Sequence, residues 1–151
     1  MNFEKTKTQD IPLIESLIRK NRPLVGDCKN LKEKLSAESF SLLKIFSGKS
    51  FAGFVEIEFF ELEARINCFV LDKEFQGKGF GLEALKELAE RLKKKRIERV
   101  FLLVSTDNLR AKRLYEKAGF EFVALFNDND RSLSFEELEL SLLDEMPAYV
   151  S

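Results

Sequence analysis

The sequence contains no histidine, and this absence removes several classes of chemistry. Without an imidazole the chain has no Ser-His-Asp or Cys-His nucleophile pair, no histidine-ligated metal and no histidine general base. Any acid–base chemistry has to use carboxylates, tyrosine or chains of water. We therefore expect no metal cofactor.

Cysteine is scarce as well. Cys28 and Cys68 lie far apart in the sequence and outside any C-x-x-C pattern, which predicts neither a disulfide nor a zinc site. The first residues lack the apolar stretch of a signal peptide, and no segment approaches the roughly 18 uninterrupted apolar residues of a membrane span. These features favour a protein of the reducing cytoplasm with no membrane partner.

Charge of either sign is not in excess, since 25 Lys and Arg face 26 Asp and Glu for a net charge of -1. This balance argues against nucleic acid as a partner, because non-specific binding needs a basic surface. The 151 residues, 44% of them hydrophobic, predict one folded domain spanning residues 1–151. Fifteen Phe and no Trp give its core a strong aromatic share.

The hydrophobic pattern alternates between the periods of strands and helices, which predicts a mixed α/β fold. The segment from Asn21 to Asn30, with Pro23 and Gly26, is predicted to be a loop. Helices are expected from Thr8 through Ile18, and over Leu31–Leu35, Leu82–Arg96 and Asn108–Lys117. Strands are expected over Phe3–Lys7, Phe40–Phe46, Phe51–Phe60, Ala64–Leu71, Val100–Val104, Phe120–Phe126 and Leu133–Leu142, with the unbroken apolar run Val100–Val104 buried on both faces.

A glycine-rich stretch between a predicted strand and a predicted helix reads Gln76-Gly77-Lys78-Gly79-Phe80-Gly81. Alternate glycines let the main chain approach a ligand closely, and the unpaired amides that open the helix favour an anion such as a diphosphate. The alternative is a structural turn. A P-loop ending at Ser47–Ser50 fails because its first glycine would fall at Leu43, and a dinucleotide fingerprint at Gly79–Ala84 is weakened by the intervening Asp72–Lys78.

A second motif follows the buried strand and reads Asn108-Leu109-Arg110-Ala111-Lys112-Arg113-Leu114-Tyr115-Glu116-Lys117-Ala118-Gly119-Phe120. Taken singly, Asn108 is a helix N-cap, Leu114 and Tyr115 are core residues, and Gly119 is a C-cap. Together the segment resembles the N-x-x-A-x-x-L-Y-x-x-x-G-F block of the GNAT superfamily of N-acyltransferases. The glycine loop resembles that family's Q/R-x-x-G-x-G/A motif, in the same order and at a fitting separation.

The resemblance implies a single-domain fold with a central mixed, mostly antiparallel sheet of about six to seven strands, a splayed parallel pair, and about four flanking helices. It also implies acetyl-CoA, or another acyl-CoA, as co-substrate. The pantetheine arm would lie between the strand ending at Leu71 and the strand Val100–Val104, where one amide would stabilise the oxyanion. The residues implied in cofactor binding are Phe69, Val70, Leu71, Gln76, Gly77, Lys78, Gly79, Phe80, Gly81, Leu82 and Asn108, and Tyr115 would be the general acid that protonates the CoA thiolate.

The general base is not assignable from the motifs. Relatives that acetylate proteins carry a glutamate at a strand position that here is Arg65, which leaves Glu56, Glu58 and Glu63 as the available carboxylates. Glu56 and Glu58 share one face of a predicted strand and could serve, or could be solvated residues of a half-exposed sheet. An acyl-enzyme on Cys68 is disfavoured because nothing evident activates its thiol, so direct attack in a ternary complex is expected.

The leading hypothesis is an N-acetyltransferase that acts on a primary amine, either a small molecule or a peptide, as a monomer or homodimer. The loop Asn21–Asn30 would help to shape the acceptor pocket. Two alternatives remain open: a non-catalytic acyl-CoA-binding sensor or regulatory module, and an interaction domain that docks through the charged helix face from Glu83 to Lys94.

Overall fold

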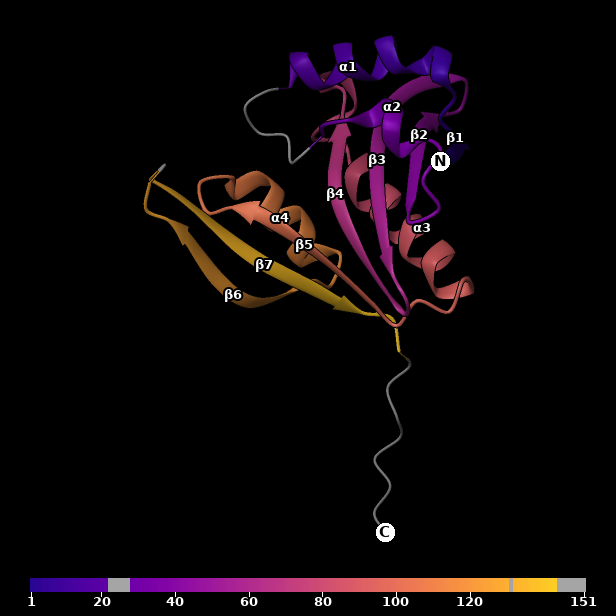
Figure 1. Cartoon of the computed structure of the whole chain (residues 1–151). Coiled ribbons are helices and arrows are strands. Elements are labelled where there is room, and N and C mark those ends of the chain that lie inside the picture. The colour runs from indigo at the N-terminus through magenta and orange to yellow at the C-terminus, as the bar shows by residue number, and fades with distance from the viewer. Residues whose placement is uncertain (22–27, 131, 144–151) are drawn as a thin grey trace.

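The computed structural model describes residues 1–21, 28–130 and 132–143. Within this part the chain forms one seven-stranded sheet in the order β1-β2-β3-β4-β5-β7-β6, with helices against it (Figure 1). The strands are β1 (Asn2–Lys5), β2 (Phe40–Ser47), β3 (Ser50–Phe60), β4 (Glu63–Leu71), β5 (Arg99–Ser105), β6 (Glu121–Asp128) and β7 (Leu133–Ser141). The helices are α1 (Ile11–Lys20), α2 (Leu31–Lys34), α3 (Phe80–Lys94) and α4 (Leu109–Lys117), with 3-10 turns η1 (Thr8–Asp10) and η2 (Lys73–Phe75).

The expected architecture is confirmed, with strand and helix bounds shifted by a few residues. Every neighbouring pair of strands is antiparallel except β4 and β5, which are parallel. The parallel pair follows from the connection, because α3 carries the chain from the end of β4 back to the start of β5. No described helix has the length and apolar character that a membrane crossing requires.

Two hydrophobic cores lie on opposite faces of the sheet. On one face α3 and α4 pack over β3, β4 and β5, around buried side chains such as Ile57, Leu85 and Leu102. On the other face α1 packs over β3 and β4, because Ile14, Leu17 and their neighbours recur at helical spacing along one side of the helix. We call these the α3 face and the α1 face.

The prediction that β5 is buried on both faces is wrong. Val100, Leu102 and Val104 are buried on the α3 face, but Leu103 on the opposite side of the strand is 49% exposed. The apolar run correctly indicated a strand. An apolar run does not predict whether a helix covers the second face of a strand, and the main sheet contacts of α1 and α2 are with β2, β3 and β4.

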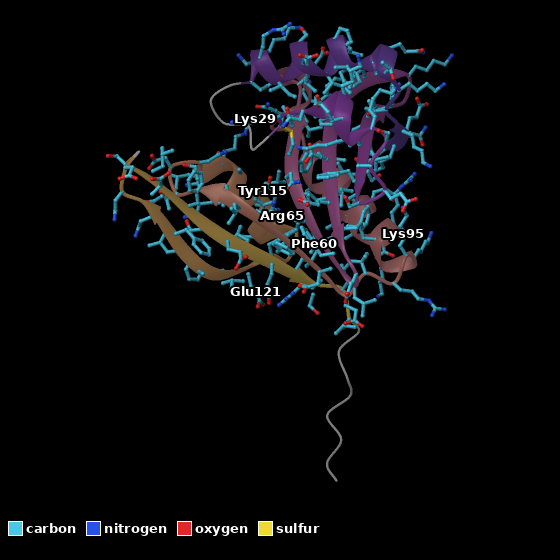
Figure 2. The ribbon with its side chains drawn as sticks, in the orientation of Figure 1. Lys29, Phe60, Arg65, Lys95, Tyr115 and Glu121 are labelled. Atoms are coloured by element: carbon cyan, nitrogen blue, oxygen red, sulfur yellow. A yellow bond between two sulfur atoms is a disulfide. The ribbon has the colours of Figure 1, made fainter. Side chains whose placement is uncertain are left out.

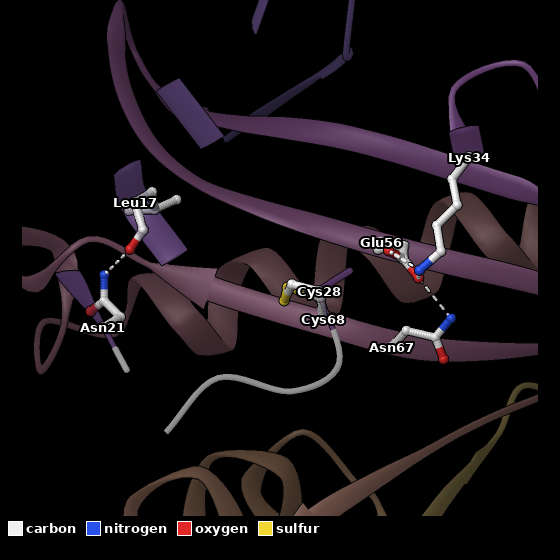
Figure 3. Close-up of a disulfide and its surroundings, with 7 residues drawn as sticks. All are labelled: Leu17, Asn21, Cys28, Lys34, Glu56, Asn67 and Cys68. Atoms are coloured by element: carbon white, nitrogen blue, oxygen red, sulfur yellow. Dashed lines mark hydrogen bonds and ion pairs between the residues drawn. A yellow bond between two sulfur atoms is a disulfide. The ribbon is translucent and has the colours of Figure 1, made fainter. Parts of the chain in front are cut away.

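The prediction of two free cysteines is also wrong, because Cys28 and Cys68 form a disulfide (Figure 3). The residues are 40 positions apart, but the chain after α1 returns to β4 and brings their Cα atoms within 5.6 Å. Closing a loop of this length stabilises a fold by about 4 kcal/mol in the chain-entropy description. The expectation of a reducing compartment was based on the absence of a disulfide, and the disulfide removes that support. Residues 22–27 of the predicted loop Asn21–Asn30 lie outside the described residues.

Candidate functional site

The parallel strands β4 and β5 are joined along only half of their length. Their pairing runs from Glu63 opposite Arg99 to Ile66 opposite Leu102 and then stops, although β4 continues to Leu71. In Figure 1 the two strands lie together at the lower end and diverge toward the upper end. The facing edges beyond the last pair therefore carry backbone donors and acceptors that no described strand satisfies, as a ligand lying between them requires.

A β-bulge at Asn67 marks the point where the strands part. Ile57 pairs with Ile66 and Glu56 with Cys68, so Asn67 is an extra residue in β4. Its side chain therefore lies on the α1 face, beside that of Cys68 rather than opposite to it. A bulge bends its strand and increases the local twist, which explains why β4 leaves β5 here.

The bulge is held by a network of charged side chains on the α1 face (Figure 3). The Asn67 amide donates to Glu56 Oε2 at 2.8 Å and to Glu58 Oε1 at 3.1 Å. Lys34, from α2, donates to both oxygens of Glu56 at 3.0 and 3.1 Å. Arg65 donates to Asn67 Oδ1 at 2.7 Å and to Glu58 Oε1 at 3.3 Å. Both carboxylate oxygens of Glu56, Glu58 Oε1 and Asn67 Oδ1 are thus bonded to a cation or an amide.

The interpretation of Glu56 as a solvated residue is wrong, because its side chain is fully buried. A carboxylate at such a position needs a charged partner, and Lys34 supplies it. Glu58 is 20% exposed and so retains contact with solvent. Of the two carboxylates, only Glu58 is open to an incoming molecule.

The glycine loop lies directly beyond the open ends of the strands. Gly77 has φ of 76° and Gly79 has φ of 83°, values that residues with a Cβ rarely adopt. Gly81 is required for a different reason, since a Cβ there would lie 2.9 Å from Leu114 in α4. Two glycines thus shape the loop, and the third lets α4 approach the first turn of α3.

The amides of the loop are free. No described residue accepts a hydrogen bond from the backbone nitrogens of residues 77–82, and the first bonded amide of the helix is that of Glu83, which donates to the Gly79 carbonyl at 3.1 Å. The loop glycines are exposed, so these amides border solvent. Together with the positive end of the α3 dipole they form a suitable place for an anion.

Gln76 anchors the start of the loop. Its side-chain amide donates to the Leu71 carbonyl at 2.7 Å and to Asn21 Oδ1 at 3.1 Å, which joins the loop to the ends of β4 and α1. Part of the hydrogen-bonding capacity of Gln76 and of the Leu71 carbonyl is therefore already used within the protein. Their predicted contacts with a cofactor stay predictions.

Helix α4 carries the two predicted residues of the second motif. Asn108 is the N-cap, and its Oδ1 accepts from the Ala111 amide at 3.2 Å. Tyr115 is partly buried against the α3-face core, with its ring 5.6 Å from that of Phe120 in an edge-on arrangement. Burial raises the pKa of the Tyr115 hydroxyl to about 12, so this group is protonated at neutral pH and can act as a proton donor.

The face of β5, β7 and β6 opposite to α3 and α4 is not covered by any described helix (Figure 2). The strand register places Glu58, Arg65, Phe101 and Glu139 in one row across this open face, and Leu103 beside Glu137 in the next. A hollow of about 360 Å³ lies there. It is lined by Phe60, Glu63, Arg99, Phe101, Val123, Glu137 and Glu139.

Several of these features could not be recognised from the sequence. In the sequence Lys34 and Glu137 cannot be distinguished from ordinary surface charges. Asn67, by contrast, could have indicated the bulge, because Asn is depleted in regular strands. Of the described residues, no group of three or more acidic or cysteine side chains is arranged to hold a metal ion.

Comparison with known proteins gives a consistent result. Residues 12–120 match the model of the acetyltransferase (GNAT) family. A probable spermine N(1)-acetyltransferase of Bacillus subtilis subsp. natto (strain BEST195) is 35% identical over 74 residues, which are 48% of this chain and 49% of that protein. The match thus extends over about half the length of the curated relative.

Solved structures share the fold. The ribosomal-protein-S18-alanine N-acetyltransferase of Escherichia coli superposes with a TM-score of 0.80 at 18% identity, covering 99% of both chains. An acetyltransferase of Bacillus subtilis, solved in complex with CoA, superposes with a TM-score of 0.76 at 18% identity, covering 94% of this chain and 99% of that one. At such identities the similarity establishes the fold.

Proposed function

The chain belongs to the acetyltransferase (GNAT) family, and from this premise we propose that it transfers an acetyl group from acetyl-CoA to a primary amine of a polyamine. The observation that carries the proposal is the interrupted pairing of β4 and β5 with the free amides of residues 77–82 at its mouth. An extended ligand with a diphosphate at one end fits both features at once.

The binding groups follow from the geometry. The amides of the glycine loop, with Lys78 beside them, hold the diphosphate at the start of α3. The open edges of β4 and β5, at Phe69 to Leu71 and at Leu103 to Ser105, bond the pantetheine amides as a missing strand would. Asn108 closes the site from the start of α4. The thioester then lies near the Asn67 bulge, where a strand amide freed from pairing stabilises the oxyanion.

The reaction is direct attack within a ternary complex. The amine nitrogen forms a bond with the acetyl carbon while the carbon–sulfur bond breaks, and the electron pair of that bond stays on sulfur. Tyr115 gives its proton to the departing thiolate. Because the thiol, with a pKa of about 8.5, is a stronger acid than Tyr115, with a pKa of about 12, this transfer is unfavourable by itself, and a proton from the amine has to be returned to Tyr115. The ammonium nitrogen loses two protons as it becomes an amide. One of them reprotonates Tyr115, and the other reaches solvent.

Glu58 is the carboxylate that receives the first proton from the ammonium, directly or through water. It is more exposed than Glu56, whose charge is already balanced by Lys34. Cys68 takes no covalent part, because its sulfur is bonded to that of Cys28 and its side chain is buried.

A polyamine acceptor is supported by two independent observations. Among the described residues, the open face carries the carboxylates of Glu58, Glu63, Glu121, Glu137 and Glu139 and the guanidinium groups of Arg65 and Arg99. Such an excess of negative charge attracts a ligand with several ammonium groups, and the aromatic rings beside it suit the methylene segments between them. In addition, the relative from B. subtilis subsp. natto is named as a spermine acetyltransferase.

The test is a titration with acetyl-CoA followed by measurement of thiol release with spermine, spermidine and a panel of monoamines. We expect saturable binding of acetyl-CoA and thiol release that is faster with the polyamines than with the monoamines. Binding without release for any amine would indicate a sensor module. Equal rates of thiol release with monoamines would be consistent with an acetyltransferase but would contradict a polyamine as the preferred acceptor.

A further inference from the structure

Arg110 in the first turn of α4 is placed against the glycine loop. A Cβ built on Gly77 would lie 3.3 Å from Arg110 Nη2, so the guanidinium rests beside the first glycine of the loop. Leu114, one turn further along α4, packs against Gly81 in the first turn of α3, and this contact sets the position of Arg110. The side chain thus reaches from a separate element to the row of free amides.

The guanidinium has no carboxylate partner among the described residues, and the residue is exposed. Lys112, two positions further along the same helix, is by contrast paired with Glu136. An unpaired arginine beside a row of free amides forms, with them, a two-sided cradle for an anion. A planar guanidinium presents parallel N–H groups that match two oxygens of a phosphate, whereas a lysine acts as a point charge.

We propose that Arg110 binds the diphosphate of CoA from the side opposite to the loop amides, and so sets the affinity for the nucleotide end of the co-substrate. This inference rests on the proposed function. It also explains why the guanidinium of Arg110 lies beside Gly77, because both would contact the same phosphate oxygens. Any side chain at position 77 would stand between the guanidinium and the loop.

The experiment compares three ligands by direct titration: CoA, dephospho-CoA, which keeps the diphosphate but lacks the 3′-phosphate, and pantetheine, which has no phosphate. In the Arg110→Ala variant we expect affinity for CoA and for dephospho-CoA to fall equally, by about tenfold, and affinity for pantetheine to stay unchanged. Arg110→Lys is expected to recover part of the loss. The affinity of the Arg110→Ala variant for CoA should also depend less on salt concentration.

Lys94→Ala is the matched control, since it removes one exposed positive charge at the opposite end of α3, about 20 Å from the loop. It should leave all three affinities unchanged. A loss for CoA but not for dephospho-CoA would assign Arg110 to the 3′-phosphate and overturn the proposal. So would unchanged binding in Arg110→Ala while the wild type binds CoA. If the wild-type protein itself binds no CoA, the proposed function fails as well.

Discussion

The two halves of the β4–β5 pair belong to the same strands but differ in how their backbones are satisfied. In the paired half, residues 63–66 of β4 bond residues 99–102 of β5, and Arg99 joins Glu63 and Glu139 across three strands. In the open half, residues 67–71 and 103–105 face each other without pairing. The Glu63 carboxylate raises the pKa of the Arg99 guanidinium above its usual range, whereas no such bridge spans the open half among the described residues.

The difference follows from residues of β4 and of the strands and helix beside it. One extra residue, Asn67, turns β4 away from β5. Its side-chain amide donates a hydrogen bond to Glu56, whose carboxylate is held in place by the ion pair with Lys34. A sheet left to its hydrogen bonds alone would close along its whole length. In the proposed function the unpaired backbone of the open half binds the co-substrate, and a charged network on the α1 face stabilises it.

The largest effect is expected from removing the cation under the bulge. Lys34→Met leaves the Glu56 carboxylate buried without a charged partner, and the free energy of unfolding should fall by about 3–5 kcal/mol in denaturant titrations. Lys34→Met combined with Glu56→Gln should recover most of this loss, because the buried charge is gone. A single-variant loss below about 1 kcal/mol would mean that the network does not support the open half.

The next effect concerns the anion site at the mouth of the open half. Gly79→Glu places a carboxylate beside the diphosphate and should weaken acetyl-CoA binding at least about 100-fold by titration. Gly48→Glu is the matched control: Gly48 also has positive φ and, like Gly79, open space around its Cβ, but it lies in the turn between β2 and β3. Equal affinities of the two variants would contradict the assignment of the loop.

The chemistry in the open half is tested by Tyr115→Phe. Loss of the proton donor should lower kcat by about 100-fold while leaving the affinity for acetyl-CoA unchanged. Because the folded pKa of Tyr115 is raised above the unfolded value of 10.0, the wild-type protein should lose stability as the pH rises from about 10 to about 12. The Tyr115→Phe variant should not show the loss of stability that the tyrosine causes over this pH range. An unchanged kcat in this variant would exclude Tyr115 as the general acid.

The smallest effect is expected at Glu58, where solvent can partly replace the side chain. Glu58→Gln should lower kcat/KM for spermine by about tenfold at neutral pH. The defect should shrink as the pH approaches about 10.4, where the amine loses its proton unaided. Glu90→Gln, at an exposed position of α3 on the other face of the sheet, should be without effect. A defect that is constant with pH would point to binding of the acceptor rather than to proton removal.

Much of the fold could be predicted because it depends on local patterns. Period-two and period-3.6 spacing, apolar runs and capping residues located the strands and α-helices to within a few residues, and Gly77, Gly79 and Asn108 identified the loop and the cap of α4. The disulfide, the exposure of Leu103 and the burial of Glu56 could not be predicted. Each depends on which segment packs over which face of the sheet, a contact between residues distant in sequence that no local pattern encodes.

Hydrogen–deuterium exchange of the backbone amides, with and without acetyl-CoA, tests the central claim most directly. The account predicts that exchange slows on addition of acetyl-CoA at residues 77–82 and at 67–71 of β4, while the already bonded amides of residues 63–66 change little. If acetyl-CoA binds and slows exchange at neither segment, the open half and the glycine loop are not where the co-substrate lies.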